Sequence, residues 1–201
     1  YTSMLNLSVM VLGAIYGSLY LVQVRHLSVT DASFVTSMIF FGTMLGSPLL
    51  GWLSDKIALR KAPMLFFAVL SVILLLLIMY LPHLSIHSLL WLFFLLGFLT
   101  SSQVISYPAI AESNEHDIAG SALGWASVLI MGAPALFQPF FGWLLDLRWS
   151  GAMVNHVPQY TLSDFRLAFW MLPITGLVAL VMGLLAKETF ARSMVKRQSN
   201  G

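Results

Sequence analysis

Long apolar segments recur along the chain and are separated by short polar connections. A membrane-spanning helix needs about 20 mainly apolar residues. Segments of that kind lie at about residues 3–24, 32–53, 63–81, 88–111, 119–145 and 165–186. The pattern predicts an all-α, polytopic membrane protein. Its six helices form one transmembrane domain over residues 1–187, and a tail follows over residues 188–201.

Composition supports a chain whose surface faces lipid. Hydrophobic residues make up 59% of the sequence and charged residues 9%. A soluble domain is about 45–50% apolar and about 25% charged. The apolar excess therefore needs the lipid bilayer as a partner. The chain has no cysteine, which excludes disulfides and thiolate metal sites. We expect no metal, no cofactor and no nucleic-acid partner.

Basic residues are distributed unevenly between the two sides of the predicted bundle. Cytoplasmic loops carry an excess of Lys and Arg. The side that would hold both termini has Lys56, Arg60, Lys61, Lys187, Arg192, Lys196 and Arg197. The other side has Arg25, Arg148 and Arg166. This asymmetry predicts that both termini are cytoplasmic. No charged residue falls in the middle of a span, where one would mark an ion pathway.

Glycines recur four residues apart in two of the predicted spans. The pairs are Gly42 with Gly46 and Gly120 with Gly124. This spacing lets helix backbones approach closely within lipid. We therefore expect close helix contacts along the second and fifth spans. The alternative is that glycine is simply frequent in membrane helices.

A polar loop with an unusual pattern follows the second span. It reads Gly51-Trp52-Leu53-Ser54-Asp55-Lys56-Ile57-Ala58-Leu59-Arg60-Lys61. This segment resembles the signature loop that joins the second and third helices in each half of a major facilitator superfamily transporter. It departs from the family pattern at Ala58, where glycine is usual, and at Leu59, where arginine is usual. Such a weakened loop is typical of the second half of these transporters, and the glycine-rich fifth span resembles their eleventh helix.

The resemblance covers the whole chain and implies a function. It implies the C-terminal six-helix half of a secondary transporter, which moves a small-molecule substrate by alternating access, coupled to an ion, the proton. The partner would be the missing N-terminal six-helix half or a second copy of the chain. We expect an integral protein of a bacterial inner (plasma) membrane. The alternative is a stand-alone six-helix protein, a relic or scaffold, without transport activity of its own.

The charged residues of the loop suggest a gate. Asp55 at the end of the second span is placed to cap the N-terminus of another helix, whose dipole favours negative charge. Arg60 and Lys61 are placed to pair with Asp55 or with lipid headgroups. We expect a gating latch that includes Gly51 and Lys56. The alternative is that the three basic residues only satisfy the positive-inside rule.

The resemblance implies that the first and fourth spans line a substrate cavity between the two halves. Tyr16 and Tyr20 share one face of the first span, and Gln103 and Tyr107 share one face of the fourth. These are the candidate substrate-binding residues. The alternative places the tyrosines at the membrane interface and makes the glutamine a bond between helices. Because this half has no Arg or Lys in the middle of a span, a neutral, zwitterionic or amphipathic substrate is favoured.

The sequence also has an acidic cluster, and it lacks the motifs of two enzyme classes. The fourth loop holds Glu112, Glu115, His116 and Asp117, and we expect a solvated segment there rather than a metal site. An intramembrane serine protease needs a serine within a Gly-x-Ser-x-Gly-like motif and a histidine within the spans. A zinc protease needs His-Glu-x-x-His. The sequence has neither arrangement, so no enzymatic activity is expected.

Overall fold

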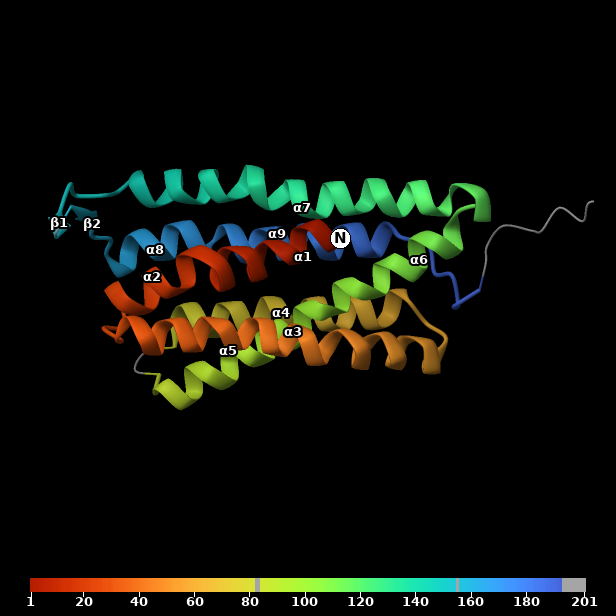
Figure 1. Ribbon diagram of the computed structural model, residues 1–201, viewed down its shortest axis with the longest axis horizontal. Coiled ribbons are helices and arrows are strands. Elements are labelled where there is room, and N and C mark those ends of the chain that lie inside the picture. Colours follow the sequence, from red (N-terminus) through yellow and green to blue (C-terminus); the bar gives the residue numbers. More distant parts are fainter. Residues whose placement is uncertain (82–83, 155, 193–201) are drawn as a thin grey trace, which may run out of the picture.

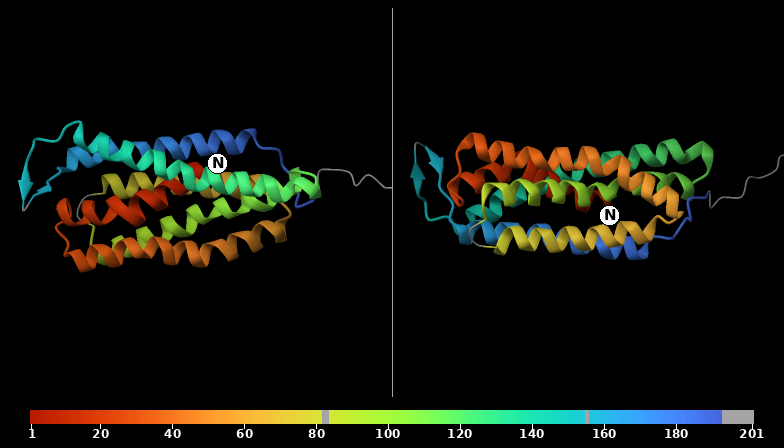
Figure 2. Two further views of the ribbon diagram at one scale, coloured as in Figure 1. Left: turned by 45° about the horizontal axis from the view of Figure 1, so that its top comes forward. Right: turned by 90° about the horizontal axis from the view of Figure 1, so that it is seen from below.

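The helical spans run side by side as one elongated bundle (Figures 1 and 2). The computed structural model describes residues 1–81, 84–154 and 156–192. The helices long and apolar enough to cross a membrane are Thr2–Gln23, Val29–Ile57, Lys61–Tyr80, Ile86–Ser113, Asp117–Asp146 and Leu162–Leu185. Each of them overlaps one predicted span. The predicted tail, residues 188–201, lies outside the described residues from 193 onward.

Three spans are continuous α-helices. They are α3 (Val29–Ile57), α4 (Lys61–Tyr80) and α7 (His116–Asp146). The start of α3 follows local sequence, because the Ser28 side chain accepts a hydrogen bond from the Asp31 backbone N–H. A serine at this position satisfies an N–H group that would otherwise have no partner.

The other three spans change helix type or break along their length. The first consists of α1 (Thr2–Ser8), the π-helix η1 (Val9–Ile15) and α2 (Tyr16–Gln23). The fourth consists of α5 (Ile86–Thr100), the 3-10 helix η2 (Ser101–Ile105) and α6 (Ser106–Ser113). The sixth consists of α8 (Leu162–Phe169) and α9 (Met171–Leu185). A short hairpin of β1 (Met153–Val154) and β2 (Val157–Pro158) precedes the sixth span.

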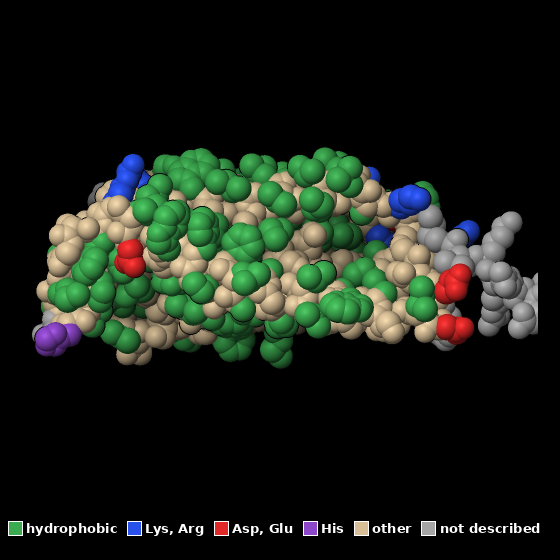
Figure 3. Space-filling view, turned by 90° about the horizontal axis from the view of Figure 1, so that it is seen from above, with side chains coloured by type: hydrophobic (Ala, Val, Ile, Leu, Met, Phe, Trp, Pro, Cys, Tyr) green, Lys and Arg blue, Asp and Glu red, His purple; other side chains and the backbone are tan. Residues whose placement is uncertain are grey.

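The two ends of the bundle differ. One end carries the β1–β2 hairpin and is called the hairpin end. The opposite end carries the turns between α3 and α4 and between α6 and α7, and is called the network end (Figure 1). On the face that Figure 3 shows, hydrophobic side chains cover the middle, and charged side chains gather towards the two ends. An apolar band between polar ends fits a bilayer.

Close glycine contacts hold α3 against α5. A Cβ added at Gly42 would overlap the Phe94 carbonyl oxygen, and one added at Gly97 would overlap the Ile39 carbonyl oxygen. A Cβ added at Gly46 would overlap the Ser101 hydroxyl. The structure thus has the close contact expected at Gly42 and Gly46.

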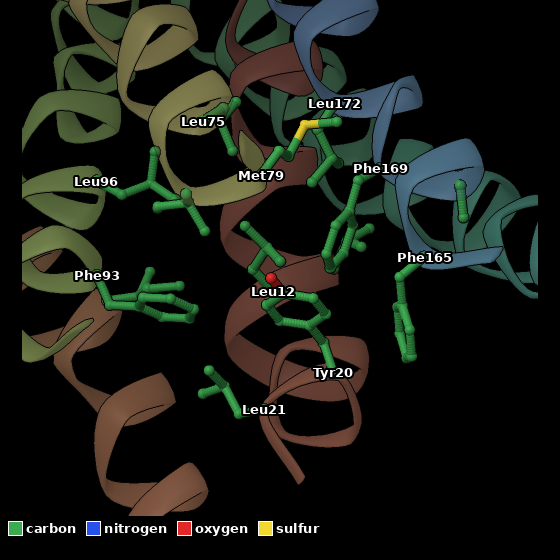
Figure 4. Close-up of a cluster of buried hydrophobic side chains, with 14 of the residues drawn as sticks. Leu12, Tyr20, Leu21, Leu75, Met79, Phe93, Leu96, Phe165, Phe169 and Leu172 are labelled. Atoms are coloured by element: carbon green, nitrogen blue, oxygen red, sulfur yellow. The ribbon is translucent and has the colours of Figure 1, made fainter. Parts of the chain in front are cut away.

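Aromatic side chains fill the core near the hairpin end (Figure 4). The Tyr20 ring lies edge-on to Phe165 and Phe169, with centroids 5.4 and 5.0 Å away. Only 1% of Tyr20 is exposed, so its ring is enclosed by the first and sixth spans. Phe93 of α5 and Leu12 of η1 belong to the same buried cluster.

Ala58 ends α3 in a conformation that L-residues rarely adopt. Its φ and ψ angles are 52° and 35°, in the left-handed region. The Ala58 and Leu59 N–H groups donate to the Asp55 and Ser54 carbonyls and close the helix. Glycine is the usual residue at such a position because it has no Cβ. The Cβ of Ala58 therefore makes this turn less favourable in conformational energy than it would be with the glycine of the family pattern.

Replacing Ala58 with glycine is expected to stabilise the protein. The left-handed conformation costs a non-glycine residue roughly 1–2 kcal/mol. The greater freedom of glycine in the unfolded chain offsets part of that, so we expect a net gain below about 1 kcal/mol. Thermal unfolding in detergent measures the gain. The control is Ala62→Gly within α4, which is expected to destabilise. Equal effects of both substitutions would contradict the left-handed turn.

Candidate functional site

A buried arginine, Arg60, organises the network end. Its Nη2 donates to Glu112 Oε1 at 2.6 Å, and its Nη1 lies 2.5 Å from Asp55 Oδ1. Nη1 also donates to the Ser54 hydroxyl at 3.0 Å. The Arg60 side chain is 6% exposed and that of Glu112 is 16% exposed, whereas that of Asp55 is 65% exposed. Arg60 and Glu112 therefore form the buried pair, and Asp55 lies at its rim.

A third carboxylate closes the N-terminus of α4. Glu188, which follows α9, accepts from the backbone N–H groups of Arg60 at 2.7 Å and Lys61 at 2.9 Å. These N–H groups have no partner within the helix. Thr189 donates its hydroxyl to Glu112. The network thus ties together the network ends of the second, third, fourth and sixth spans.

The network favours the charged forms of Arg60 and Glu188. The hydrogen bond to Glu112 raises the pKa of Arg60, although burial opposes this. Burial alone would raise the pKa of Glu188, but hydrogen bonds from four backbone N–H groups, those of Arg60 and Lys61 foremost, outweigh burial and hold that pKa below its usual value. Hydrogen bonds to an ionised group stabilise that form. An ionised cluster is strongest where water is partly excluded.

For several charged residues in and around the loop, the structure shows other contacts than the sequence predicted. Asp55 pairs with Arg60, as expected, but Glu188 rather than Asp55 caps a helix of this chain. Glu112 was expected in a solvated loop and is instead largely buried. Lys56 lies over the Trp52 ring at 4.8 Å, and nothing lies within 4 Å of a Cβ added at Gly51. The one feature of the sequence that pointed to Glu112 or Glu188 as partners of the loop is their position near span ends.

Polar side chains join the first and fourth spans near the middle of the bundle. The Thr2 hydroxyl contacts the Ser106 hydroxyl and donates to the Gln103 carbonyl at 3.3 Å. The Tyr1 and Ser102 hydroxyls lie 3.0 Å apart. The Gln103 Oε1 atom is buried and has no hydrogen-bond partner among the described residues. A buried acceptor of this kind is costly unless a donor reaches it.

A cavity of about 480 Å³ lies beside this polar contact. Its walls come from α1, α6, α7 and the end of α9, and they include the polar side chains Ser106, Ser113 and Asn114. Lys187 is its charged lining residue. Hydroxyl and amide groups in apolar walls suit a ligand that is largely uncharged.

The structure separates the four candidate substrate-binding residues. Tyr16 is partly exposed, and its hydroxyl donates to the Gln138 carbonyl of α7 at 3.3 Å. Tyr107 is partly exposed and Gln103 is 8% exposed. Tyr20 is enclosed in the aromatic core, where Arg25 Nε donates to its hydroxyl at 3.0 Å. The four do not share an open surface. Helical periodicity in the sequence defines one face of each span, but it does not show which other segments cover that face.

Two spans leave much of their surface uncovered. In the most apolar stretch of α7, 22% of residues are buried, against 33% in α3 and at least 50% in each other span. Nothing lies within 4 Å of a Cβ added at Gly120 or Gly124. The close contact expected there is absent among the residues that the structure describes. The glycine face of α7 is open.

The fold defines an integral membrane protein whose described residues form six helical spans with charges at the two ends. A family model, Major Facilitator Superfamily, matches residues 2–199. Because the match covers nearly the whole chain, the protein belongs to the major facilitator superfamily. Members of this family are transporters of small solutes rather than enzymes. A search of the curated proteins found no match.

Proposed function

We propose that this chain is the C-terminal half of a secondary transporter and moves a small solute by alternating access. The observation that carries the proposal is the uneven burial of the spans, with α7 and α3 the least covered. Gly120 and Gly124 are exposed on α7. A glycine face offers lipid chains little side-chain surface to contact, but the backbone of a second helix packs closely against such a face. A second six-helix bundle is the occupant that fits the family.

The charge network supports a division of roles within this half. Arg60, Glu112 and Glu188 hold the spans of this bundle to one another at the network end. Asp55 is the exposed carboxylate of the network. It is placed to reach a helix N-terminus of the partner bundle when that end closes. In this proposal the network end is cytoplasmic, the membrane is a bacterial inner membrane, and Asp55 is the latch.

The substrate class follows from the absence of charge at mid-membrane. No charged residue lies in the middle of a span. The unpaired Gln103 Oε1 and the neighbouring hydroxyls favour a neutral, zwitterionic or amphipathic solute that carries a hydrogen-bond donor. If the coupling ion is the proton, its carboxylate belongs to the N-terminal half.

Cysteine accessibility tests the proposal in the natural protein within membranes. The chain has no cysteine, so a single introduced thiol is the sole target on this half. Ser121→Cys reports on the network side of α7, and Phe140→Cys reports on its hairpin side. Weakening the latch with Asp55→Asn is expected to raise maleimide labelling at position 121 and lower it at position 140. An opposite change at the two ends is what alternating access requires.

A lipid-facing control variant and a disulfide measurement for the alternative function complete this test. Labelling of Leu177→Cys on α9, which is 54% exposed, should not respond to Asp55→Asn. Unchanged labelling at positions 121 and 140 would overturn the latch. Disulfide formation between two copies of Ser127→Cys, an exposed position on the glycine face, would instead favour the stand-alone protein that pairs with itself.

A further inference from the structure

A second cavity, of about 540 Å³, opens at the hairpin end and is distinct from the network and the polar contact. It lies where α2, α4 and α8 meet. Its lining includes three basic side chains, Arg25, His26 and Arg166, and apolar walls such as Leu81 and Leu84. No carboxylate lines it among the residues that the structure describes.

Neutral groups hold both arginines of this cavity in place. Arg25 Nη2 donates to the Leu81 carbonyl at 2.8 Å, and Arg25 Nε donates to the Tyr20 hydroxyl. Arg166 lies over the Tyr80 ring, 5.4 Å from its centroid. Neither arginine forms a salt bridge with any described residue. Two fixed positive charges therefore face one cavity without an acidic partner.

The closest acidic residue in sequence to Arg166 does not supply that partner. Asp164 accepts from the Thr161 backbone N–H and from the Thr161 hydroxyl, both at 2.8 Å. It is 3% exposed and forms the capping box at the start of α8. The carboxylate is thus used to begin the helix.

Aromatic residues place this cavity at the level of lipid headgroups. Tyr80 and Trp170 are 47% and 45% exposed, and their rings lie edge-on with centroids 6.3 Å apart. Exposed Tyr and Trp at span ends mark the membrane–water interface. One turn deeper, Leu77 and Ile174 are exposed on α4 and α9. A charged cavity at the interface thus continues into an apolar flank.

We propose that this cavity binds an anionic phospholipid. The phosphate lies between Arg25 and Arg166, and the acyl chains lie along the exposed flank of α4 and α9. Arginine binds phosphate oxygens with its planar fork of donors. The apolar flank favours a lipid over free phosphate, because acyl chains add a large buried area. This site is separate from the proposed transport function.

Lipid titration of the purified protein in a neutral detergent tests the site, with binding followed by native mass spectrometry. Phosphatidylglycerol is expected to bind more tightly than phosphatidylcholine with the same acyl chains. Arg166→Gln, which changes an exposed residue, is expected to weaken the binding of phosphatidylglycerol about fivefold to tenfold. The matched control is Arg148→Gln, which removes an exposed charge from the hairpin end outside the cavity.

Three outcomes would overturn the proposal. The first is equal binding of the two lipids. The second is an equal loss with Arg148→Gln and Arg166→Gln. The third is displacement of phosphatidylglycerol by millimolar inorganic phosphate, which would show a free-anion site instead of a lipid site. Thermal unfolding of Arg166→Gln should match that of the unchanged protein, so that a loss of binding reports on the cavity.

Discussion

Replacing Arg60 with glutamine is expected to destabilise the protein strongly. The substitution leaves Glu112 partly buried, with the Thr189 hydroxyl as its one remaining side-chain partner among the described residues. Removing one member of a buried ion pair costs about 3–5 kcal/mol, because the remaining charge stays buried without compensation. Thermal unfolding in detergent, followed by circular dichroism, measures the loss. It should be the largest effect of any single substitution in the network.

Two further substitutions separate the members of this network. Asp55→Asn should cost less than about 1 kcal/mol, because its carboxylate is largely exposed and screened by water. Glu112→Gln should fall between the two, since it removes the charge and keeps a hydrogen-bonding side chain. If Asp55→Asn destabilises the protein as much as Arg60→Gln, the assignment of Arg60 and Glu112 as the buried pair is wrong.

Gly42→Ala is expected to give the second large effect. The added methyl group would overlap the Phe94 carbonyl oxygen, so α3 and α5 must move apart. Overpacking of this kind typically costs about 1–3 kcal/mol. Because the obstacle is backbone rather than a flexible side chain, we expect the upper part of that range. The midpoint of thermal unfolding should fall accordingly.

The matched control for Gly42→Ala is Gly124→Ala. Nothing lies within 4 Å of a Cβ added at Gly124, so this chain should tolerate the methyl group. Alanine also favours the helix over glycine by about 1 kcal/mol. The chain on its own should therefore be unchanged or slightly stabilised. Equal destabilisation by the two substitutions would contradict the α3–α5 contact as described.

The architecture was predictable because its signals are local. A span is about 20 adjacent apolar residues, so composition along the chain is enough to find it. The pairing of Asp55 with Arg60 was also predictable, because only one turn of chain separates them. The four-residue glycine spacing predicted close contacts in two spans, and the described part of the chain has one at Gly42 and Gly46 but not at Gly120 and Gly124.

The candidate site depends on contacts between distant segments. Arg60 meets Glu112 across 52 positions, and its backbone N–H meets Glu188 across 128. Several acidic residues lie near span ends, and their order in the chain does not say which one reaches Arg60. Tyr20 illustrates the same limit. The spacing of Tyr16 and Tyr20 places both on one helix face, but it does not show that Phe165 and Phe169 enclose the Tyr20 ring.

The sequence by itself determined the class of protein, the six spans and the family, because each depends on hydrophobicity or on a short motif read along the chain. Only the tertiary structure decided which glycines touch another helix, which carboxylates neutralise Arg60 and which arginines lack an acidic partner. The physical reason is that helical periodicity defines a face of each span, whereas packing decides whether that face meets another helix of the chain.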